Sequence, residues 1–191
     1  MQWEADFLLF LQNYVRNDYL KIIMNALSSM MNYGIMVIAL IIFLLVYKKT
    51  RSIGVVALIA LLVSVIINNL ILKNMVARVR PYDAIEGLML IARKPNDYSF
   101  PSGHSANVFV VTGVITWCAK RDKKWIGILL LVLSGFIAFS RMYLGAHYPT
   151  DVIFGVMSGL IISIVIYFLI WKRIEKSSDL KSIDKTELGD E

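Results

Sequence analysis

Both histidines of this 191-residue chain lie in polar clusters that border long apolar runs. His104 stands at the start of one such run, and His147 lies four residues before Asp151. Histidine can gain or lose a proton near neutral pH, and it can also accept a phosphoryl group. A third polar cluster, residues 73–81, adds cations at the end of another apolar run. Together these clusters suggest phosphate chemistry on a lipid.

Three cations are candidates for binding a phosphate, namely Lys73, Arg80 and Arg141. Arginine offers a planar fork that matches phosphate oxygens, and lysine offers a compact charge. The alternative is that such residues flank membrane spans and extend their charged ends to lipid headgroups. That second role is assigned to the other cations beside these runs, Arg78, Arg93 and Lys94.

The segment 101–104 has the composition of a helix start next to a ligand. Pro101 suits the first turn of a helix, and Gly103 lets backbone amides approach a bound group closely. The helix that follows would direct its N-terminal amides at a phosphate. His104 could then donate a proton to a leaving oxygen. The simpler alternative is a polar cap or a contact with a lipid headgroup.

The spacing of His147 and Asp151 allows a supported nucleophile. A carboxylate next to one imidazole nitrogen fixes the tautomer and leaves the other nitrogen free to attack phosphorus. Pro149, between the two, is typical of a helix start. The alternative is therefore that Asp151 caps this helix and that His147 only pairs with it.

The composition indicates a membrane protein of one domain. It is 58% hydrophobic and 18% charged, with a mean hydropathy of +0.65, whereas soluble domains have about 45–50% apolar and about 25% charged residues. The net charge of +6 lies largely beside apolar segments, which suits anionic headgroups better than nucleic acid. Cys118 is expected to be a packing residue, and no spacing typical of a metal site occurs.

The apolar runs predict an all-α, polytopic transmembrane helix bundle. A span needs roughly 20 mostly apolar residues, and five are expected, at about 33–47 (extendable back to residue 22), 53–72, 102–120, 125–142 and 151–171. Residues 1–30 are predicted to form an interfacial amphipathic helix, with a sixth span from about residue 7 as the alternative. The transmembrane domain then covers 31–172, and 173–191 is expected to be a disordered cytoplasmic tail.

Alternating span directions bring the three polar clusters to one face of the membrane. The cations at 48–51, 120–124 and 172–173 all fall on the opposite side. The positive-inside rule places that side in the cytoplasm, so the clusters and the N-terminus would be outside. The two sides carry nearly equal numbers of cations, and this orientation holds if several cations near the clusters bind substrate.

Three motifs resemble the signature of the type 2 phosphatidic acid phosphatase superfamily. They are Lys73-x6-Arg80-Pro81, Pro101-Ser102-Gly103-His104 and Ser140-Arg141-x5-His147-x3-Asp151. The resemblance covers about residues 53 to 171 and implies a metal-independent phosphatase without a cofactor.

The resemblance also implies roles by position. His147 would be the nucleophile that forms a phosphohistidine, Asp151 would support it, and His104 would protonate the leaving group. Water would later release phosphate. The phosphoryl oxygens and their growing negative charge would be held by a set of cations and helix-start groups. These are Lys73, Arg80, Arg141, Ser102 and Gly103.

The function expected from the sequence is hydrolysis of a phosphate or diphosphate monoester on a lipid, in a bacterial plasma membrane with the site on the extracytoplasmic face. Polyprenyl diphosphate (such as undecaprenyl diphosphate) and phosphatidylglycerol phosphate are the first candidates, followed by phosphatidate and diacylglycerol diphosphate. One alternative is a lipid phosphotransferase that uses the same phosphohistidine. Another is a non-catalytic protein that binds lipid phosphates, which would need the cations but not the histidines and Asp151. The sequence leaves the headgroup and the oligomeric state open.

Overall fold

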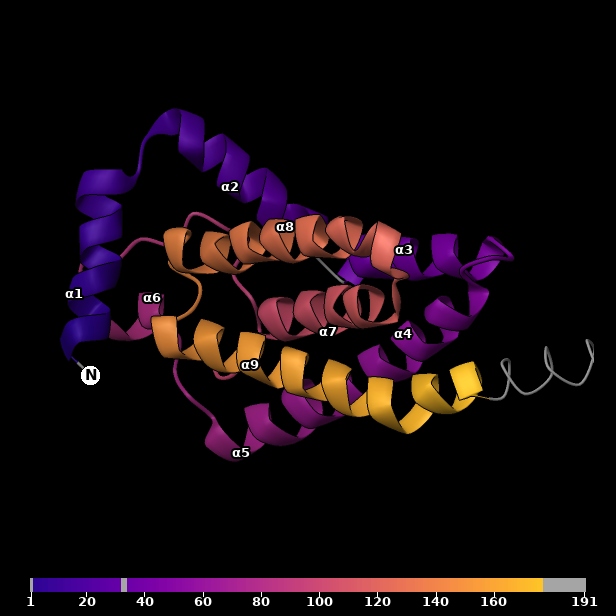
Figure 1. Cartoon of the computed structure of the whole chain (residues 1–191). Coiled ribbons are helices and arrows are strands. Elements are labelled where there is room, and N and C mark those ends of the chain that lie inside the picture. Colours follow the sequence, from indigo (N-terminus) through magenta and orange to yellow (C-terminus); the bar gives the residue numbers. More distant parts are fainter. Residues whose placement is uncertain (1, 32–33, 177–191) are drawn as a thin grey trace, which may run out of the picture.

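A computed structural model describes residues 2–31 and 34–176, and the regular elements in these ranges are helices (Figure 1). The longer helices are α1 (Gln2–Phe10), α2 (Asp18–Met30), α3 (Ile35–Val46), α4 (Arg51–Ser64), α7 (Gly103–Cys118), α8 (Lys124–Tyr143) and α9 (Pro149–Ile166). Two helices of a single turn, α5 (Lys73–Val76) and α6 (Pro81–Ala84), lie between α4 and α7. Stretches of π-helix continue α1 (Leu11–Val15), join α4 to α5 (Val65–Leu72) and continue α9 (Tyr167–Trp171), and a 3-10 turn (Arg121–Lys123) precedes α8.

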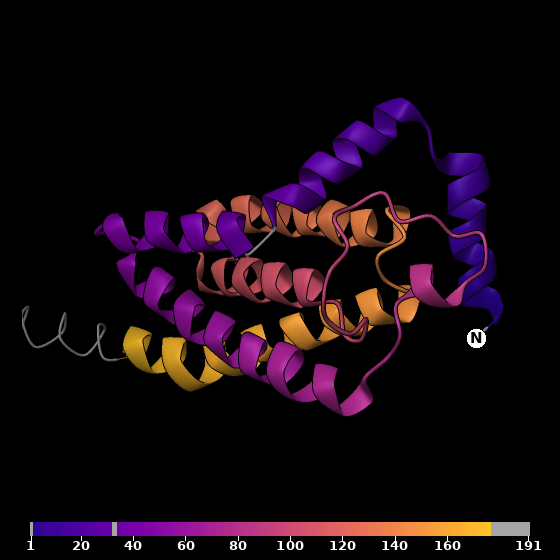
Figure 2. The ribbon, with the colours of Figure 1, turned by 180° about the vertical axis from the view of Figure 1, so that it is seen from behind.

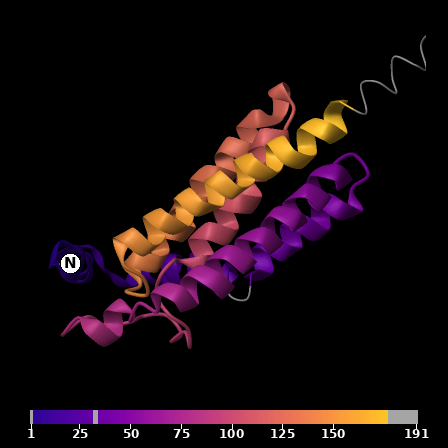
Figure 3. The ribbon, with the colours of Figure 1, turned by 90° about the horizontal axis from the view of Figure 1, so that it is seen from below.

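Helix α7 lies at the centre of the bundle. It packs against α9, α8 and α4, and nearly all of its residues are buried. A helix that is apolar on every side is typical of such a position. Figure 1 shows α7 between α8 and α9, and Figure 3 shows α9 running beside the α4–α5 stretch.

Glycines bring α7 and α9 close enough for backbone to contact backbone. A side-chain carbon built on Gly159 would lie 2.5 Å from the carbonyl oxygen of Ala106, and one on Gly155 would lie 2.6 Å from that of Ser102. Small residues four apart are a common device for close helix packing in membranes. At the same end, the amide of Ser102 donates a 3.0 Å hydrogen bond to the carbonyl oxygen of Asp151. The first turns of the two helices are therefore fixed side by side.

The membrane bundle expected from the sequence is confirmed. Three helical stretches are long and apolar enough to span a bilayer, namely Arg51–Ala84, Arg121–Tyr143 and Pro149–Lys176. Helices α2 and α3 pass the same test only as a pair, bent by 52°. The predicted span at 102–120 is α7, whose 16 residues give a helix about 24 Å long. It is shorter than a typical span because its neighbours, not lipid, enclose it.

The N-terminal segment is two helices and not the single interfacial helix expected over 1–30. The chain turns between them at Asn17, whose side chain accepts a 2.9 Å hydrogen bond from the amide of Leu20 and so caps α2. Helix α1 lies across one end of the bundle, and α2 returns along α8 (Figures 1 and 2). At the other terminus the helical stretch continues to Lys176, so residues 173–176 of the predicted tail are helical. Residues 177–191 lie outside the described part of the chain.

Substituting Gly159→Ala should weaken the bundle, because its new carbon would press on the backbone of α7. We expect a loss of about 1–3 kcal/mol of stability, as is usual for overpacking. The measurement is thermal unfolding of the purified protein in detergent. Gly135→Ala on α8 is the matched control, since a carbon there meets nothing within 4 Å. Equal unfolding temperatures for the two variants would contradict a close α7–α9 contact.

Candidate active site

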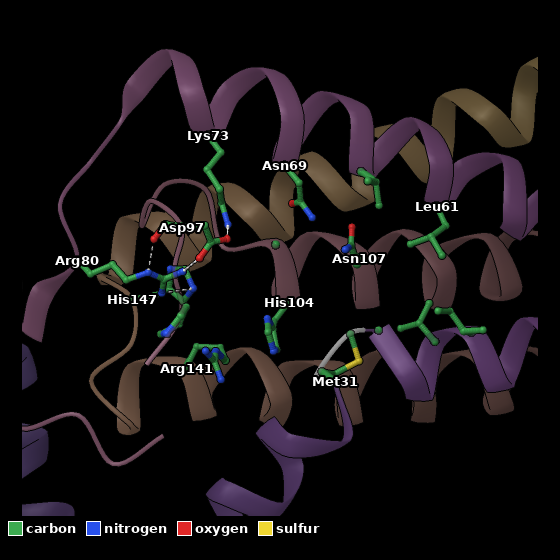
Figure 4. Close-up of a pocket in the computed structure, with 16 residues that line it drawn as sticks. Met31, Leu61, Asn69, Lys73, Arg80, Asp97, His104, Asn107, Arg141 and His147 are labelled. Atoms are coloured by element: carbon green, nitrogen blue, oxygen red, sulfur yellow. Dashed lines mark hydrogen bonds and ion pairs between the residues drawn. The ribbon is translucent and has the colours of Figure 1, made fainter. Parts of the chain in front are cut away.

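The three polar clusters meet at one end of the bundle, as the alternation of spans predicted. Residues from the start of α5, the start of α7, the end of α8 and the loop before α9 line one cavity of about 460 Å³ (Figure 4). The cavity contains five of the predicted site residues and the backbone of a sixth: Lys73, Arg80, His104, Arg141, His147 and Gly103. Away from these residues its lining is mostly apolar, with Met31, Val37, Ile38, Leu61 and Val65.

His147 is held in the tautomer that a nucleophile requires. Its Nε2 lies 3.3 Å from a terminal nitrogen of Arg80. A guanidinium can only donate hydrogen bonds, so Nε2 is the acceptor and the proton is on Nδ1. That nitrogen faces Oδ2 of Asp151 at 3.6 Å, slightly beyond hydrogen-bond length. Burial lowers the pKa of His147 to about 3, and Arg80 and Arg141 act in the same direction. The imidazole is therefore neutral at physiological pH.

Asp151 serves both as a helix cap and as the partner of His147, so the two interpretations of the sequence are compatible. Its Oδ2 accepts hydrogen bonds from the hydroxyl of Ser99 at 2.5 Å and from the amide of Tyr148 at 3.0 Å. The second of these caps α9. Oδ1 accepts from Arg78 at 2.6 Å. The carboxylate is fully buried, and these donors fix its orientation.

Arg78 is the main site residue that sequence reasoning missed, because it was assigned to the headgroups. Besides Asp151, its guanidinium donates to Thr150 at 2.8 Å and to Glu4 at 2.7 Å. Its Cζ lies 3.8 Å from the ring centroid of Tyr148. Residues 77–80 are not helical, and side chains two apart on an extended chain point the same way. The spacing of two residues between Arg78 and Arg80 was therefore the feature of the sequence that could have placed Arg78 near the site.

Asp97 also went unnoticed in the sequence, and it occupies the cation cluster. Its carboxylate bridges Lys73 at 2.5 Å and Arg80 at 2.6 Å, and its carbonyl oxygen accepts from Nε of Arg80 at 2.8 Å. Partial burial alone would raise the pKa of this carboxyl, but the two cations outweigh burial and lower it to about 2. Two of the three predicted phosphate-binding cations thus already hold an anion. Asp97 lies in the long connection between α6 and α7, which Figure 2 shows as a loop. Because this segment has no helical periodicity, the direction of its side chains could not be predicted from the sequence.

Among the described residues, four buried polar atoms of side chains that line the cavity lack a hydrogen-bond partner: Nε of Arg141, Nε2 of His104, Oδ1 of Asn69 and Nδ1 of His147. Nε of Arg141 and Nε2 of His104 can both serve a bound phosphate. The other end of the Arg141 guanidinium donates to the hydroxyl of Ser28 on α2. Ser102 differs from the prediction, since its hydroxyl caps α7 and contacts Ser105 at 2.9 Å. Ser102 is therefore not among the residues that line the cavity.

A second cavity of about 530 Å³ adjoins the first and shares Asp97, His104 and Arg141 with it. Its lining is polar, with residues of α2 and of the connection before α7. They include Asn25, Ser28, Ser29, Arg93, Lys94 and Asn96. This end of the bundle therefore has a mostly apolar cavity and a mostly polar one side by side. In the part of the chain that is described, no three His, Cys, Asp or Glu side chains gather as a metal ion would need; the absence of a metal stays a prediction.

Comparisons with known proteins identify the family of the chain. A sequence model of the PAP2 superfamily matches residues 53–175. The chain belongs to this superfamily. It is 33% identical over 142 residues to an undecaprenyl-diphosphatase of Sulfolobus acidocaldarius, covering 74% of this chain and 65% of the relative. It is 32% identical over 109 residues to a lipid A 4'-phosphatase of Bacteroides thetaiotaomicron, covering 54% and 48%. The chain thus spans less than two thirds of both relatives.

A solved PAP2 structure shares the fold. The crystal structure of the PAP2-type phosphatidylglycerolphosphate phosphatase from Bacillus subtilis superposes with a TM-score of 0.76 at 25% identity, covering 90% of this chain and 86% of that one. The family resemblance of the three motifs is therefore confirmed. The PAP2 relatives named here carry the names of lipid phosphatases, with different lipids in those names.

Acid should destabilise this PAP2 protein through His147. Its pKa is about 3 when folded and about 6.5 when unfolded, so the unfolded chain binds more protons between these values. Stability is then lost as pH falls below about 6.5, by up to about 1.4 kcal/mol per pH unit. His147→Asn should lose less stability than the wild type between about pH 7.5 and about pH 5, measured by thermal unfolding. An equal loss in both proteins would show that His147 is not buried and neutral.

Proposed function

We propose that this PAP2 protein is an integral membrane phosphatase that hydrolyses a phosphate or diphosphate monoester on a lipid. The observation that carries the proposal is the position of His147. Its unprotonated Nε2 lies beside Arg80 and its Nδ1 faces Asp151, in a cavity whose other lining is mostly apolar. A neutral imidazole with this support is a competent nucleophile.

The first step is attack by Nε2 of His147 on phosphorus. The new N–P bond forms as the bond to the leaving oxygen breaks, and His104, which enters this step protonated, gives its proton to that oxygen and becomes neutral. Lys73, Arg80 and Arg141 hold the phosphoryl oxygens and stabilise the charge that develops on them. The amide of Gly103, at the start of α7, is placed to assist.

The second step releases phosphate. Water attacks the phosphohistidine, its proton passes to His104, and the N–P bond breaks. Asp151 stabilises the positive imidazole while phosphorus is attached, through the proton on Nδ1. The cycle uses only water and groups of the protein itself, so we propose that it needs no metal ion.

The two adjoining cavities support a lipid as the substrate. The apolar cavity suits the hydrocarbon chain, and the polar one suits water or a headgroup. Polyprenyl diphosphate and phosphatidylglycerol phosphate remain the first candidates, because relatives carry both names. The basic connections 48–51 and 120–124 lie at the opposite end of the bundle from the site (Figure 1), which supports an extracytoplasmic active site.

The decisive test is phosphate release from a panel of purified lipid phosphates and diphosphates. We expect wild-type protein to release inorganic phosphate in the presence of EDTA, and His147→Asn to be slower by at least about a thousandfold. Thermal unfolding of the variant checks that the fold is intact. Activity that persists in His147→Asn would refute the phosphohistidine. Phosphate that passes only to an added alcohol would indicate a phosphotransferase.

A substrate must compete with Asp97 for Lys73 and Arg80. Asp97→Asn should therefore tighten inhibition by inorganic phosphate, lowering its inhibition constant by about three- to tenfold, since the loss of a half-exposed competing charge is worth roughly 1 kcal/mol. The control is Asp83→Asn, which removes the same charge from an exposed pair with Lys94. If Asp97→Asn binds phosphate no more tightly than Asp83→Asn, the carboxylate does not compete with substrate.

A further inference from the structure

A buried acid of the N-terminal helix reaches the active site. Glu4 of α1 has 0% exposure, although it is a carboxylate outside the region matched by the family. One of its oxygens accepts a hydrogen bond from Arg78 at 2.7 Å, and the other accepts from the hydroxyl of Thr150 at 2.6 Å and from its amide at 3.3 Å. A buried charge is costly unless such partners satisfy it. The burial of the Glu4 carboxylate therefore requires a physical explanation.

Arg78 connects this acid to the nucleophile. One terminal nitrogen contacts Glu4 and the other contacts Asp151 at 2.6 Å. The guanidinium is planar and rigid, so it holds the two carboxylates at a fixed separation. Tyr148 covers its face. Helix α1, the segment 77–80 and the start of α9 are joined through this one side chain.

The charges of the group suit the reaction. His147 is neutral before attack, so Arg78 is the charged partner of Asp151 at that stage. An arginine paired with Asp151 alone would cancel its charge and weaken its hold on the imidazole. Glu4 shares the same guanidinium, and the three side chains together carry one negative charge. Asp151 therefore keeps its attraction for the positive imidazole that forms when His147 attacks phosphorus.

We propose that Glu4 and Arg78 are positioning residues for the pair of Asp151 and His147, and that α1 is a working part of the active site. Arg78 orients the carboxylate, and Glu4 keeps that carboxylate effectively charged. The proposal rests on the proposed function in taking His147 as the nucleophile. Arg78 lies at an undefined position of the first motif, between Lys73 and Arg80, and Glu4 precedes the matched region altogether.

The test compares Glu4→Gln with Asp6→Asn, an exposed acid of the same helix. With the best lipid of the panel, Glu4→Gln should lower kcat by about tenfold or more while KM stays within about twofold, as for other residues that support a catalytic group. Asp6→Asn should match the wild type. A kcat for Glu4→Gln equal to that of Asp6→Asn would overturn the proposal.

A second readout does not depend on turnover. Vanadate must bond to His147 to mimic the transition state, whereas inorganic phosphate needs only the cations. In Glu4→Gln, stabilisation against thermal unfolding by vanadate should fall by about half or more, while that by phosphate is unchanged. A parallel loss for both anions would indicate general damage to the fold and would overturn the positioning role.

Arg78→Gln alone would remove the cation that the buried acids Glu4 and Asp151 share, so it is tested together with Glu4→Gln. The double variant keeps one negative charge on the group, and its kcat should exceed that of Arg78→Gln by about threefold or more, since coupled sites are not additive. If kcat did not recover in the double variant, the proposed balance of charges would be wrong.

His147→Asn in the same assay separates the two proposals. If it retains activity the proposed function fails, whereas unchanged Glu4→Gln beside inactive His147→Asn refutes only the positioning role.

Discussion

The close approach of α7 and α9 is the constraint on which the site depends. Gly155 and Gly159 remove the side chains that would hold the two backbones apart. The hydrogen bond from Ser102 to the carbonyl oxygen of Asp151 then sets the relative height of the two helix starts. His104 and Asp151 sit one turn or less into these helices. Their separation is therefore decided by backbone packing, which is stiff, and not by flexible loops.

Around this pair of helices, buried charges are arranged in compensating groups. Asp97 balances Lys73 and Arg80, and Glu4 and Asp151 share Arg78. The two groups touch at His147, which contacts Arg80 through one ring nitrogen and faces Asp151 with the other. Since electrostatic interactions are strong in a site shielded from water, a phosphate that enters changes both groups at once. In the proposed reaction, binding of the phosphate and activation of His147 would therefore be physically linked.

The motifs allowed much of this to be predicted. The parity of the spans was enough to bring Lys73, His104 and His147 to one end. Arg78, Asp97 and Ser99 were missed because they lie in non-helical segments and, unlike Arg80 and His147, occupy no defined position of a motif. The role of Glu4 was missed for a different reason: its hydrogen-bond partners are more than seventy residues away in the sequence. The hydroxyl of Ser102 was expected to bind phosphate, but it caps α7 instead, because a serine at the start of a helix can serve either purpose.

The N-terminal helices illustrate a signal that was present but not used. Asn17 followed by Asp18 is a typical helix start, and it marks the boundary between the two helices. The break allows α1 to lie across the end of the bundle while α2 runs along α8. A single continuous helix could not have brought both Glu4 and Ser28 to the site.

The two cavities that share His104 and Arg141 give the proposed active site two routes of access. A lipid that entered through the apolar cavity would not have to leave the bilayer, and its dephosphorylated product could return by the same route. In the proposed reaction the phosphate would be freed beside His104 and Arg141, which also line the polar cavity. The lipid product would then remain in the bilayer, and the phosphate would pass into water. Because the two products would be in different phases, they would rarely meet again in the site, and the reverse reaction would be rare.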